Sequence, residues 1–143
     1  MTPVVFIDSS VWIAALRSRS GGSLQVLRLS ALGVVEPVVS SEVLSEVDRN
    51  VRKKLPGALR MYAHTLATLR PTVQATPSPE AIEDAAQLVH PKDAAILAAA
   101  LQAGVDYLVT LDRRHFGPAA PHVAASIRIV TPGELLRNLL PDG

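Results

Sequence analysis

The sequence contains no cysteine, has few aromatic residues and lacks any long hydrophobic run. Without cysteine there is no disulfide framework and no thiolate ligand for a zinc site. With one tryptophan, two tyrosines and two phenylalanines, no platform for stacking nucleic-acid bases is evident. No apolar run approaches the roughly 18–20 residues that span a bilayer, and no basic-then-apolar leader is visible. Together these absences predict a cytoplasmic protein that does not enter the membrane.

What the chain does contain is typical of a globular domain. Its 143 residues, 48% of them hydrophobic, are enough to bury a core, and we expect a single domain over residues 1–143. Fourteen basic and 13 acidic residues leave a net charge of +1, which does not indicate a nucleic-acid binder. The basic residues are grouped, however, in residues 49–54 and at Arg113 and Arg114. Each group is either a solvated face or a contact for phosphate.

Runs rich in β-branched residues alternate with segments of helical periodicity. Strands are expected at residues 4–8, 34–39, 107–110 and 126–130. Helices are expected from residue 79 and at residues 11–16, 24–32, 41–54, 59–69, 91–103 and 133–140. Residues 72–79 are polar and are not predicted as a strand, and Pro37 suggests an edge strand or an irregular strand end. The alternation predicts an α/β fold with a mainly parallel sheet covered on both faces.

Four acidic residues, Asp8, Glu46, Asp93 and Asp112, stand where surface charge does not explain them. Asp8 and Asp112 follow apolar runs, Asp93 opens a helical segment, and Glu46 lies within another. Because ligands gather beyond the carboxyl ends of parallel strands, we expect an acidic pocket there. Carboxylates held together repel, and a divalent cation such as Mg²⁺ or Mn²⁺ relieves that penalty. The pattern favours metal-assisted phosphodiester hydrolysis, with Glu42 as the alternative to Glu46 because it shares the same helix face.

The local sequences around these acids resemble the four motifs of PIN-domain nucleases, in the same order. They are residues 6–12 (FIDSSVW), 41–47 (SEVLSEV), 92–100 (KDAAILAAA) and 108–116 (LVTLDRRHF). The resemblance implies a three-layer α/β/α sandwich and an Mg²⁺- or Mn²⁺-dependent ribonuclease. It also implies that Asp8, Glu46, Asp93 and Asp112 bind the metal directly or through water. Domains of this length are often VapC-type toxins, so the resemblance implies an RNA substrate, a cognate antitoxin and a homodimer.

One departure from the family pattern affects the expected metal content. Many relatives carry a further acid where this chain has His115 and Phe116. We therefore expect one well-defined metal site, with any second ion weakly held or brought in by the RNA phosphate. His115 is interpreted as a partly buried, hydrogen-bonded histidine, with phosphate contact or proton transfer as the alternative. Ser10 and Thr110 either orient the carboxylates or cap the backbone, and Trp12 is expected in the core or at a dimer contact.

Two other functions fit an α/β chain with acids at strand ends. The first is a catalytically silent PIN-like module that binds RNA or a protein, and the presence of all four acids argues against it. The second is a phosphoacceptor like a response regulator, which needs a lysine near the end of a late strand. The only lysines are Lys53, Lys54 and Lys92, and none is at such a place.

Overall fold

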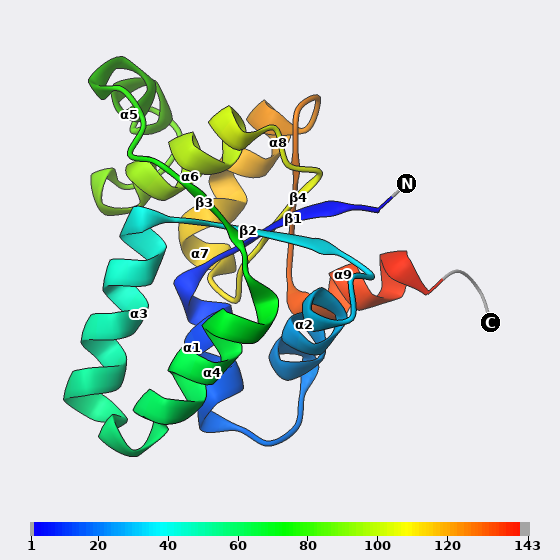
Figure 1. Ribbon diagram of the computed structural model, residues 1–143. Coiled ribbons are helices and arrows are strands. Elements are labelled where there is room, and N and C mark those ends of the chain that lie inside the picture. Colours follow the sequence, from blue (N-terminus) through cyan, green and yellow to red (C-terminus); the bar gives the residue numbers. More distant parts are fainter. Residues whose placement is uncertain (1, 141–143) are drawn as a thin grey trace.

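A five-stranded sheet forms the centre of the protein, in the order β3-β2-β1-β4-β5 (Figure 1). The computed structural model describes residues 2–140, so Met1 and residues 141–143 of the predicted domain lie outside the described residues. All four strand pairings are parallel. The chain moves outward from β1 to β3, then crosses back to β4 on the other side of β1. The strand order therefore reverses between β1 and β4, the position at which such sheets bind ligands.

The first half of the chain builds three strands and the helices between them. In order, these elements are β1 (Val4–Ile7), α1 (Ser9–Arg17), α2 (Gly22–Ala31), β2 (Glu36–Ser40), α3 (Ser41–Lys54), the 3₁₀ turn η1 (Pro56–Ala58), α4 (Leu59–Leu69) and β3 (Thr72–Gln74). The second half contains α5 (Pro79–Ala85), α6 (Pro91–Ala103), β4 (Tyr107–Val109), α7 (Arg113–Phe116), η2 (Gly117–Ala119), α8 (Ala120–Val123), β5 (Arg128–Val130) and α9 (Pro132–Leu139).

Local sequence signals explain where the helices near the sheet edge begin and end. The Ser40 hydroxyl accepts a hydrogen bond from the backbone N–H of Val43 at 3.2 Å, which caps α3 as its sequence predicts. Pro91 occupies the first turn of α6 and places Asp93 in that same turn. Gly104 ends α6 in the left-handed conformation, with φ of 66°, which glycine adopts without steric cost. These signals start α3 and α6 at the carboxyl edge of the sheet.

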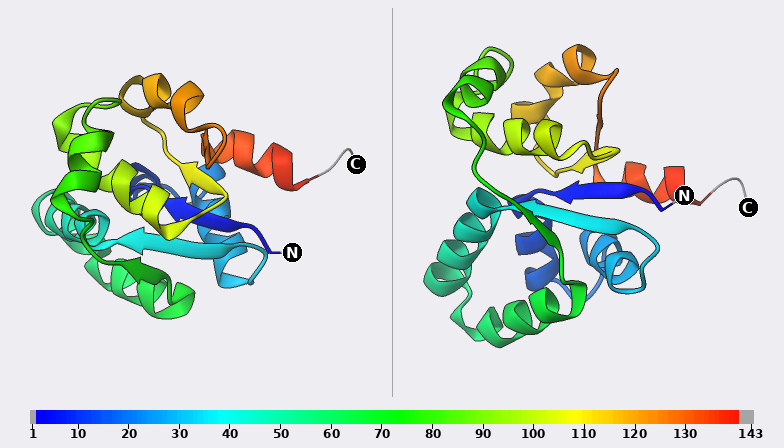
Figure 2. Two further views of the ribbon diagram at one scale, coloured as in Figure 1. Left: turned by 90° about the horizontal axis from the view of Figure 1, so that it is seen from above. Right: turned by 45° about the horizontal axis from the view of Figure 1, so that its top comes forward.

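Helices cover both faces of the sheet (Figure 2). One face carries α1, α2 and α4, with α3 beside α1 and α9 against α2. The other face carries α5, α6, α7 and α8. This is the predicted three-layer α/β/α sandwich, with a sheet that is parallel throughout the described residues. None of the helices within residues 2–140 is long and apolar enough to cross a membrane.

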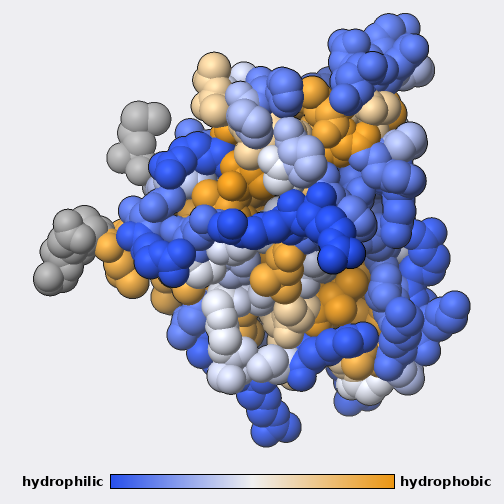
Figure 3. All heavy atoms as spheres, turned by 180° about the vertical axis from the view of Figure 1, so that it is seen from behind, coloured by the Kyte–Doolittle hydropathy of each residue, from blue (hydrophilic) through white to orange (hydrophobic). Residues whose placement is uncertain are grey.

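The core lies between the sheet and its two helical layers. Phe6, Ile7 and Leu108 of the central strands are fully buried, and so is Trp12, which meets Tyr62 edge-to-face with ring centroids 6.5 Å apart. Trp12 therefore belongs to the core, one of its two predicted positions. Most alanines of α6 are buried as well (Ala94, Ala98, Ala99 and Ala100), and their small side chains let this helix pack closely on the sheet. On the face shown in Figure 3, hydrophobic side chains lie in separate areas divided by a hydrophilic band.

The predictions for Pro37 and for residues 72–79 need correction. Pro37 lies in β2, an interior strand, so the edge alternative was wrong. The sheet tolerates this proline because β3 pairs only from Val38 onward, which makes Pro37 part of an irregular strand end. Residues 72–74 form the edge strand β3, which was not predicted because Thr72 and Val73 are exposed and lack an apolar pattern. The short helices α7 and α8 were also not predicted.

Candidate functional site

The site lies at the carboxyl ends of β1 and β4, where the strand order reverses. Asp8 directly follows β1, and its backbone N–H donates to the Val109 carbonyl oxygen of β4 at 3.0 Å. Thr110 follows Val109, and its backbone N–H donates in turn to the Val130 carbonyl of β5 at 2.9 Å. The sheet hydrogen bonds thus extend one residue past the strands and hold Asp8 and Thr110 side by side.

Asp8 is buried, with 4% of its surface exposed, and two hydroxyls support one of its oxygens. Its Oδ2 accepts hydrogen bonds from Ser10 Oγ at 2.7 Å and from Thr110 Oγ1 at 2.8 Å. Burial raises the pKa of the Asp8 carboxyl, the two hydroxyls counteract this, and the charge of Glu46 raises the pKa further. The ionised carboxylate is therefore poorly compensated, which favours a bound cation.

The same two hydroxyls connect Asp8 to the turn that carries Asp112. Ser10 Oγ accepts from the backbone N–H of Leu111 at 3.1 Å, and Thr110 Oγ1 accepts from the backbone N–H of Asp112 at 2.9 Å. Ser10 and Thr110 therefore perform both of the roles that the sequence left open. They orient a carboxylate and satisfy backbone donors, so the positions of Asp8 and the Asp112 backbone depend on one network.

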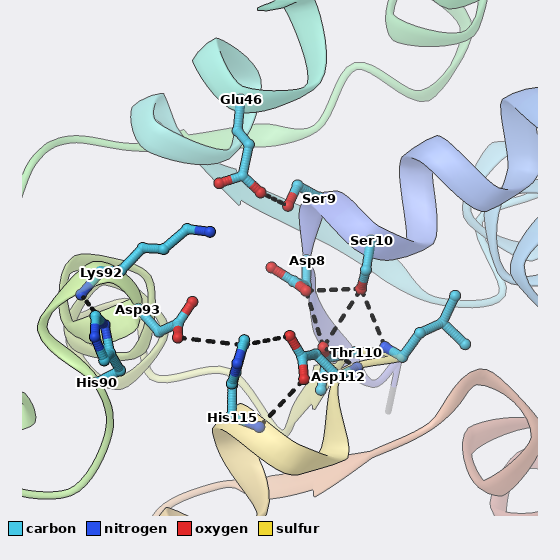
Figure 4. Close-up of polar contacts among 11 residues, drawn as sticks. Asp8, Ser9, Ser10, Glu46, His90, Lys92, Asp93, Thr110, Asp112 and His115 are labelled. Carbon is cyan, nitrogen blue, oxygen red and sulfur yellow. Dashed lines mark hydrogen bonds and ion pairs between the residues drawn. The ribbon is translucent and has the colours of Figure 1, made fainter. Parts of the chain in front are cut away.

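Glu46, and not Glu42, faces the cavity that contains Asp8. Glu46 projects from α3, and its Oε1 accepts a hydrogen bond from the Ser9 hydroxyl (Figure 4). Glu42 lies one turn earlier and accepts from Thr76 Oγ1 at 2.7 Å, in a neighbouring groove. The hydrogen bond from Thr76, which comes just after β3, holds Glu42 in this groove, which Glu46 also lines.

Asp93 presents a buried oxygen that lacks a hydrogen-bond partner within the described residues. Only 8% of Asp93 is exposed, and its Oδ2 is one of few such atoms there. The nearest counter-charge is His115 Nδ1, at 3.6 Å. Burial raises the pKa of the Asp93 carboxyl; His115 and Lys92 oppose the rise, while Asp112 and Glu46 add to it. A bound metal ion would give this buried oxygen the partner that it lacks.

Asp112 begins α7 and is held by His115 through both of its oxygens. The backbone N–H of His115 donates to Oδ1 at 3.2 Å, which caps this short helix, and His115 Nδ1 lies 2.5 Å from Oδ2. The imidazole thus lies between Asp112 and Asp93 (Figure 4), with its side chain 44% exposed. The contacts agree with the interpretation of a bonded histidine, but the residue is exposed, so the expectation of partial burial was wrong. The contacts also place a nitrogen next to two of the four acids.

The four acids line one cavity of about 190 Å³, together with residues from α1, α6 and α7. The other lining residues are Ser9, Ser10, Ile13, Lys92, His115 and Phe116. Carboxylate oxygens are the donors that Mg²⁺ and Mn²⁺ prefer, and the unpaired Asp93 oxygen needs a partner, so the residues present fit such an ion. Within residues 2–140, however, no three His, Asp or Glu side chains are already close enough to form a metal-binding group.

Two residues that line the acidic cavity and one beside it were not singled out by sequence, although each has a visible signal. Ser9 adjoins Asp8, and Lys92 adjoins Asp93. Glu134 completes a capping box with Thr131 at the start of α9, and the Thr-x-x-Glu spacing is in the sequence. Glu134 also forms an ion pair with Arg113, the residue after Asp112. Arg113 is thus paired with Glu134, while its side chain stays 66% exposed, which agrees with the solvent-facing interpretation.

Comparison with known proteins places this geometry in a family. A family profile described as the PIN domain matches residues 4–114. The chain belongs to the PIN domain family. Among curated proteins, no significant match to this PIN domain was found.

Solved structures share the fold of this PIN domain at low sequence identity. They include VapBC2 from Rickettsia felis bound to a promoter DNA fragment, with a TM-score of 0.65 and 16% identity over 90% of this chain and 98% of that one. DNA-bound VapBC from Salmonella typhimurium has a TM-score of 0.65 and 19% identity over 92% of this chain and 99% of that one. PAE2754 from Pyrobaculum aerophilum has a TM-score of 0.64 and 16% identity over 96% of this chain and 89% of that one. At these identities the likeness establishes the fold.

Proposed function

We propose that this PIN domain is a divalent-metal-dependent ribonuclease that hydrolyses RNA phosphodiester bonds with Mg²⁺ or Mn²⁺. The observation that carries the proposal is the cavity lined by Asp8, Glu46, Asp93 and Asp112, in which one buried Asp93 oxygen has no hydrogen-bond partner. PIN domains are generally nucleases, which supports the same reaction class. The chain has no cysteine, and among the described residues the cavity serines bond Glu46, Asp8 and Thr110 and not His115, so the residues suit activated water rather than a covalent intermediate.

In this proposal the four acids hold the ion directly or through water, and the other residues position them. When bound, the ion makes a water easier to deprotonate and offsets the charge that develops on the phosphoryl oxygens. Ser10 and Thr110 keep Asp8 Oδ2 in place through the 2.7 and 2.8 Å hydrogen bonds. Ser9 fixes Glu46 in the same way. These contacts reduce the reorganisation that ligand binding requires.

We also propose that the protein is a VapC-type toxin acting in the cytoplasm, as a homodimer with a cognate antitoxin. The support is its PIN domain and its structural likeness to chains from two VapBC structures along nearly their whole length. Strong expression without the antitoxin should arrest growth, and co-expression of a short neighbouring gene product should restore it. Normal growth under strong expression would count against the toxin assignment while leaving the nuclease proposal intact.

The nuclease proposal is tested by incubating total RNA with the protein in Mn²⁺, in Mg²⁺ and in excess EDTA. We expect cleavage with either metal and none in EDTA, and loss of cleavage in Asp93→Asn. The matched control is Asp84→Asn, because Asp84 is an exposed helix aspartate outside the cavity. Cleavage that persists in EDTA, or full activity in Asp93→Asn, contradicts the proposal. Tight RNA binding without metal-dependent turnover would instead support the silent binding module.

A further inference from the structure

Lys92 is a cation without a structural partner at the rim of the acidic cavity. It lies in the first turn of α6, directly before Asp93, and extends toward the space shared by Glu46 and Asp93 (Figure 4). It makes no ion pair within residues 2–140. A positive charge at a helix N-terminus is opposed by the helix dipole, so local helix energetics do not favour a lysine here. An anionic ligand in the cavity would provide the missing partner.

A second, larger cavity continues from the first along the groove between α3 and α6. Its volume is about 500 Å³, and it shares Glu46 and Lys92 with the acidic cavity. Arg49 lies on its α3 side, one turn beyond Glu46, and Thr76 lies near the end of β3. Like Lys92, Arg49 makes no ion pair among the described residues. The groove therefore begins at the proposed reaction site and carries two unpaired cations along its length.

The two volumes indicate what each cavity can hold. About 190 Å³ lies below the roughly 300–1,000 Å³ of pockets that enclose whole small molecules, so the acidic cavity suits a phosphate and ions. About 500 Å³ is within that range and suits a nucleoside unit. Among residues 2–140, no aromatic side chain lines the groove, so these residues offer no base stacking there. Recognition in the groove must then depend on the charged backbone of the ligand.

We propose that single-stranded RNA leaves the acidic cavity along the α3–α6 groove, with Lys92 binding the scissile phosphate and Arg49 the phosphate of the adjoining nucleotide. The inference rests on the proposed ribonuclease function and specifies how its substrate is held. Phosphate approaching four carboxylates meets like-charge repulsion, which Lys92 offsets at the rim. Arg49 offers a planar fork that matches phosphate oxygens. Glu42 also lines the groove and opposes phosphate binding there.

The test measures binding of a fluorescent single-stranded RNA by anisotropy in EDTA, across a salt series. Lys92→Met and Arg49→Met should each weaken binding several-fold, and each should reduce the slope of log affinity against log salt by about 0.7. Lys92→Arg should restore binding, and Glu42→Gln should strengthen it because it removes a negative charge while keeping an acceptor for Thr76. The matched controls are Lys53→Met and Arg60→Met, both exposed residues outside the groove. Their slopes should stay near that of the wild type.

The outcomes separate this inference from the proposed function. If wild type cleaves RNA with Mn²⁺ but Lys92→Met and Arg49→Met bind with wild-type slopes, the groove assignment is wrong and the ribonuclease stands. If the slopes fall as expected but no metal produces cleavage, the groove assignment stands and the ribonuclease fails. Equal losses in the two control variants would also overturn the assignment, because they would show a diffuse electrostatic effect. Thermal unfolding of each variant verifies that the fold is intact.

Discussion

Replacing Asp93 by asparagine should make the protein more stable while removing a proposed metal ligand. In the metal-free protein this carboxylate is buried, one of its oxygens has no hydrogen-bond partner in the described structure, and Asp112 and Glu46 repel it. Asparagine has nearly the same shape but no charge. The substitution therefore relieves desolvation and repulsion without leaving a cavity.

The magnitude follows from the difference between the charged and the neutral side chain. A buried polar group left unsatisfied costs about 1–3 kcal/mol, and more when it is charged, so asparagine removes the part that is due to the charge. Against this, the variant loses the attraction of His115 and Lys92 and a favourable interaction of about 0.3–1 kcal/mol between an acid in the first turn of α6 and the helix dipole. The burial effect is larger, so the free energy of unfolding should rise by about 1–2 kcal/mol. For a protein of this size, that corresponds to roughly 2–8 °C in Tm.

The assay is urea unfolding in EDTA at pH 7, followed by the fluorescence of Trp12, the single tryptophan, which is fully buried. Because the pKa of Asp93 is raised in the folded state, its penalty is fully present above the folded pKa and disappears as pH falls toward the ordinary value of 3.8. The stability gap between Asp93→Asn and wild type should therefore close in acid. The exposed control Asp84→Asn should change stability by less than about 0.5 kcal/mol.

Manganese should reverse the order of stability. Binding to the native state stabilises wild type by an amount that grows with ion concentration, and Asp93→Asn should gain less. The reasoning is refuted if Asp93→Asn is no more stable than wild type in EDTA, or if Mn²⁺ stabilises both proteins equally.

Three further predictions concern the network and the caps around the site. Thr110→Val removes a hydroxyl that donates to Asp8 at 2.8 Å, so it should lower the free energy of unfolding by about 1–3 kcal/mol. Thr110→Ser keeps the hydroxyl and should lower it less, and urea unfolding of both variants measures the difference. Thr131→Ala removes half of the capping box of α9 and should cost about 0.5–2 kcal/mol in thermal unfolding, with Thr131→Ser close to wild type. The pKa of Glu134 is lowered to about 2, mainly by its hydrogen bond to Arg113 and further by Thr131. Ionised Glu134 therefore adds to the free energy of unfolding above pH 4.5, and this stabilisation is lost as pH falls toward 2. Since the Glu134 and Arg113 side chains are 33% and 66% exposed, the stabilisation should amount to less than about 1 kcal/mol. Glu134→Gln should remove this pH dependence of stability in urea titrations at acid pH.

Much of the fold could be predicted because its signals are local. The buried strands β1 and β4 are apolar runs, and α6 is framed by Pro91 and Gly104, so its predicted bounds match the structure. β3 could not be predicted in the same way, because its side chains are largely exposed and only its pairing with β2 makes it a strand. The choice between an edge strand and an irregular strand end at Pro37 stayed open for a related reason, since the point at which β3 begins to pair cannot be read from β2 alone.

The sequence by itself determined which acids are present, in which order, and that two of them follow strands. Only the tertiary structure decided which of Glu46 and Glu42 lines the acidic cavity, because the partner of Glu42 is Thr76, 34 residues away along the chain. It likewise decided that Arg113 pairs with Glu134 and that His115 lies between Asp93 and Asp112. Helical periodicity assigns a side chain to a face but not to a partner. Partners are set by long-range packing, and here that packing distinguishes the acidic cavity from the groove beside it.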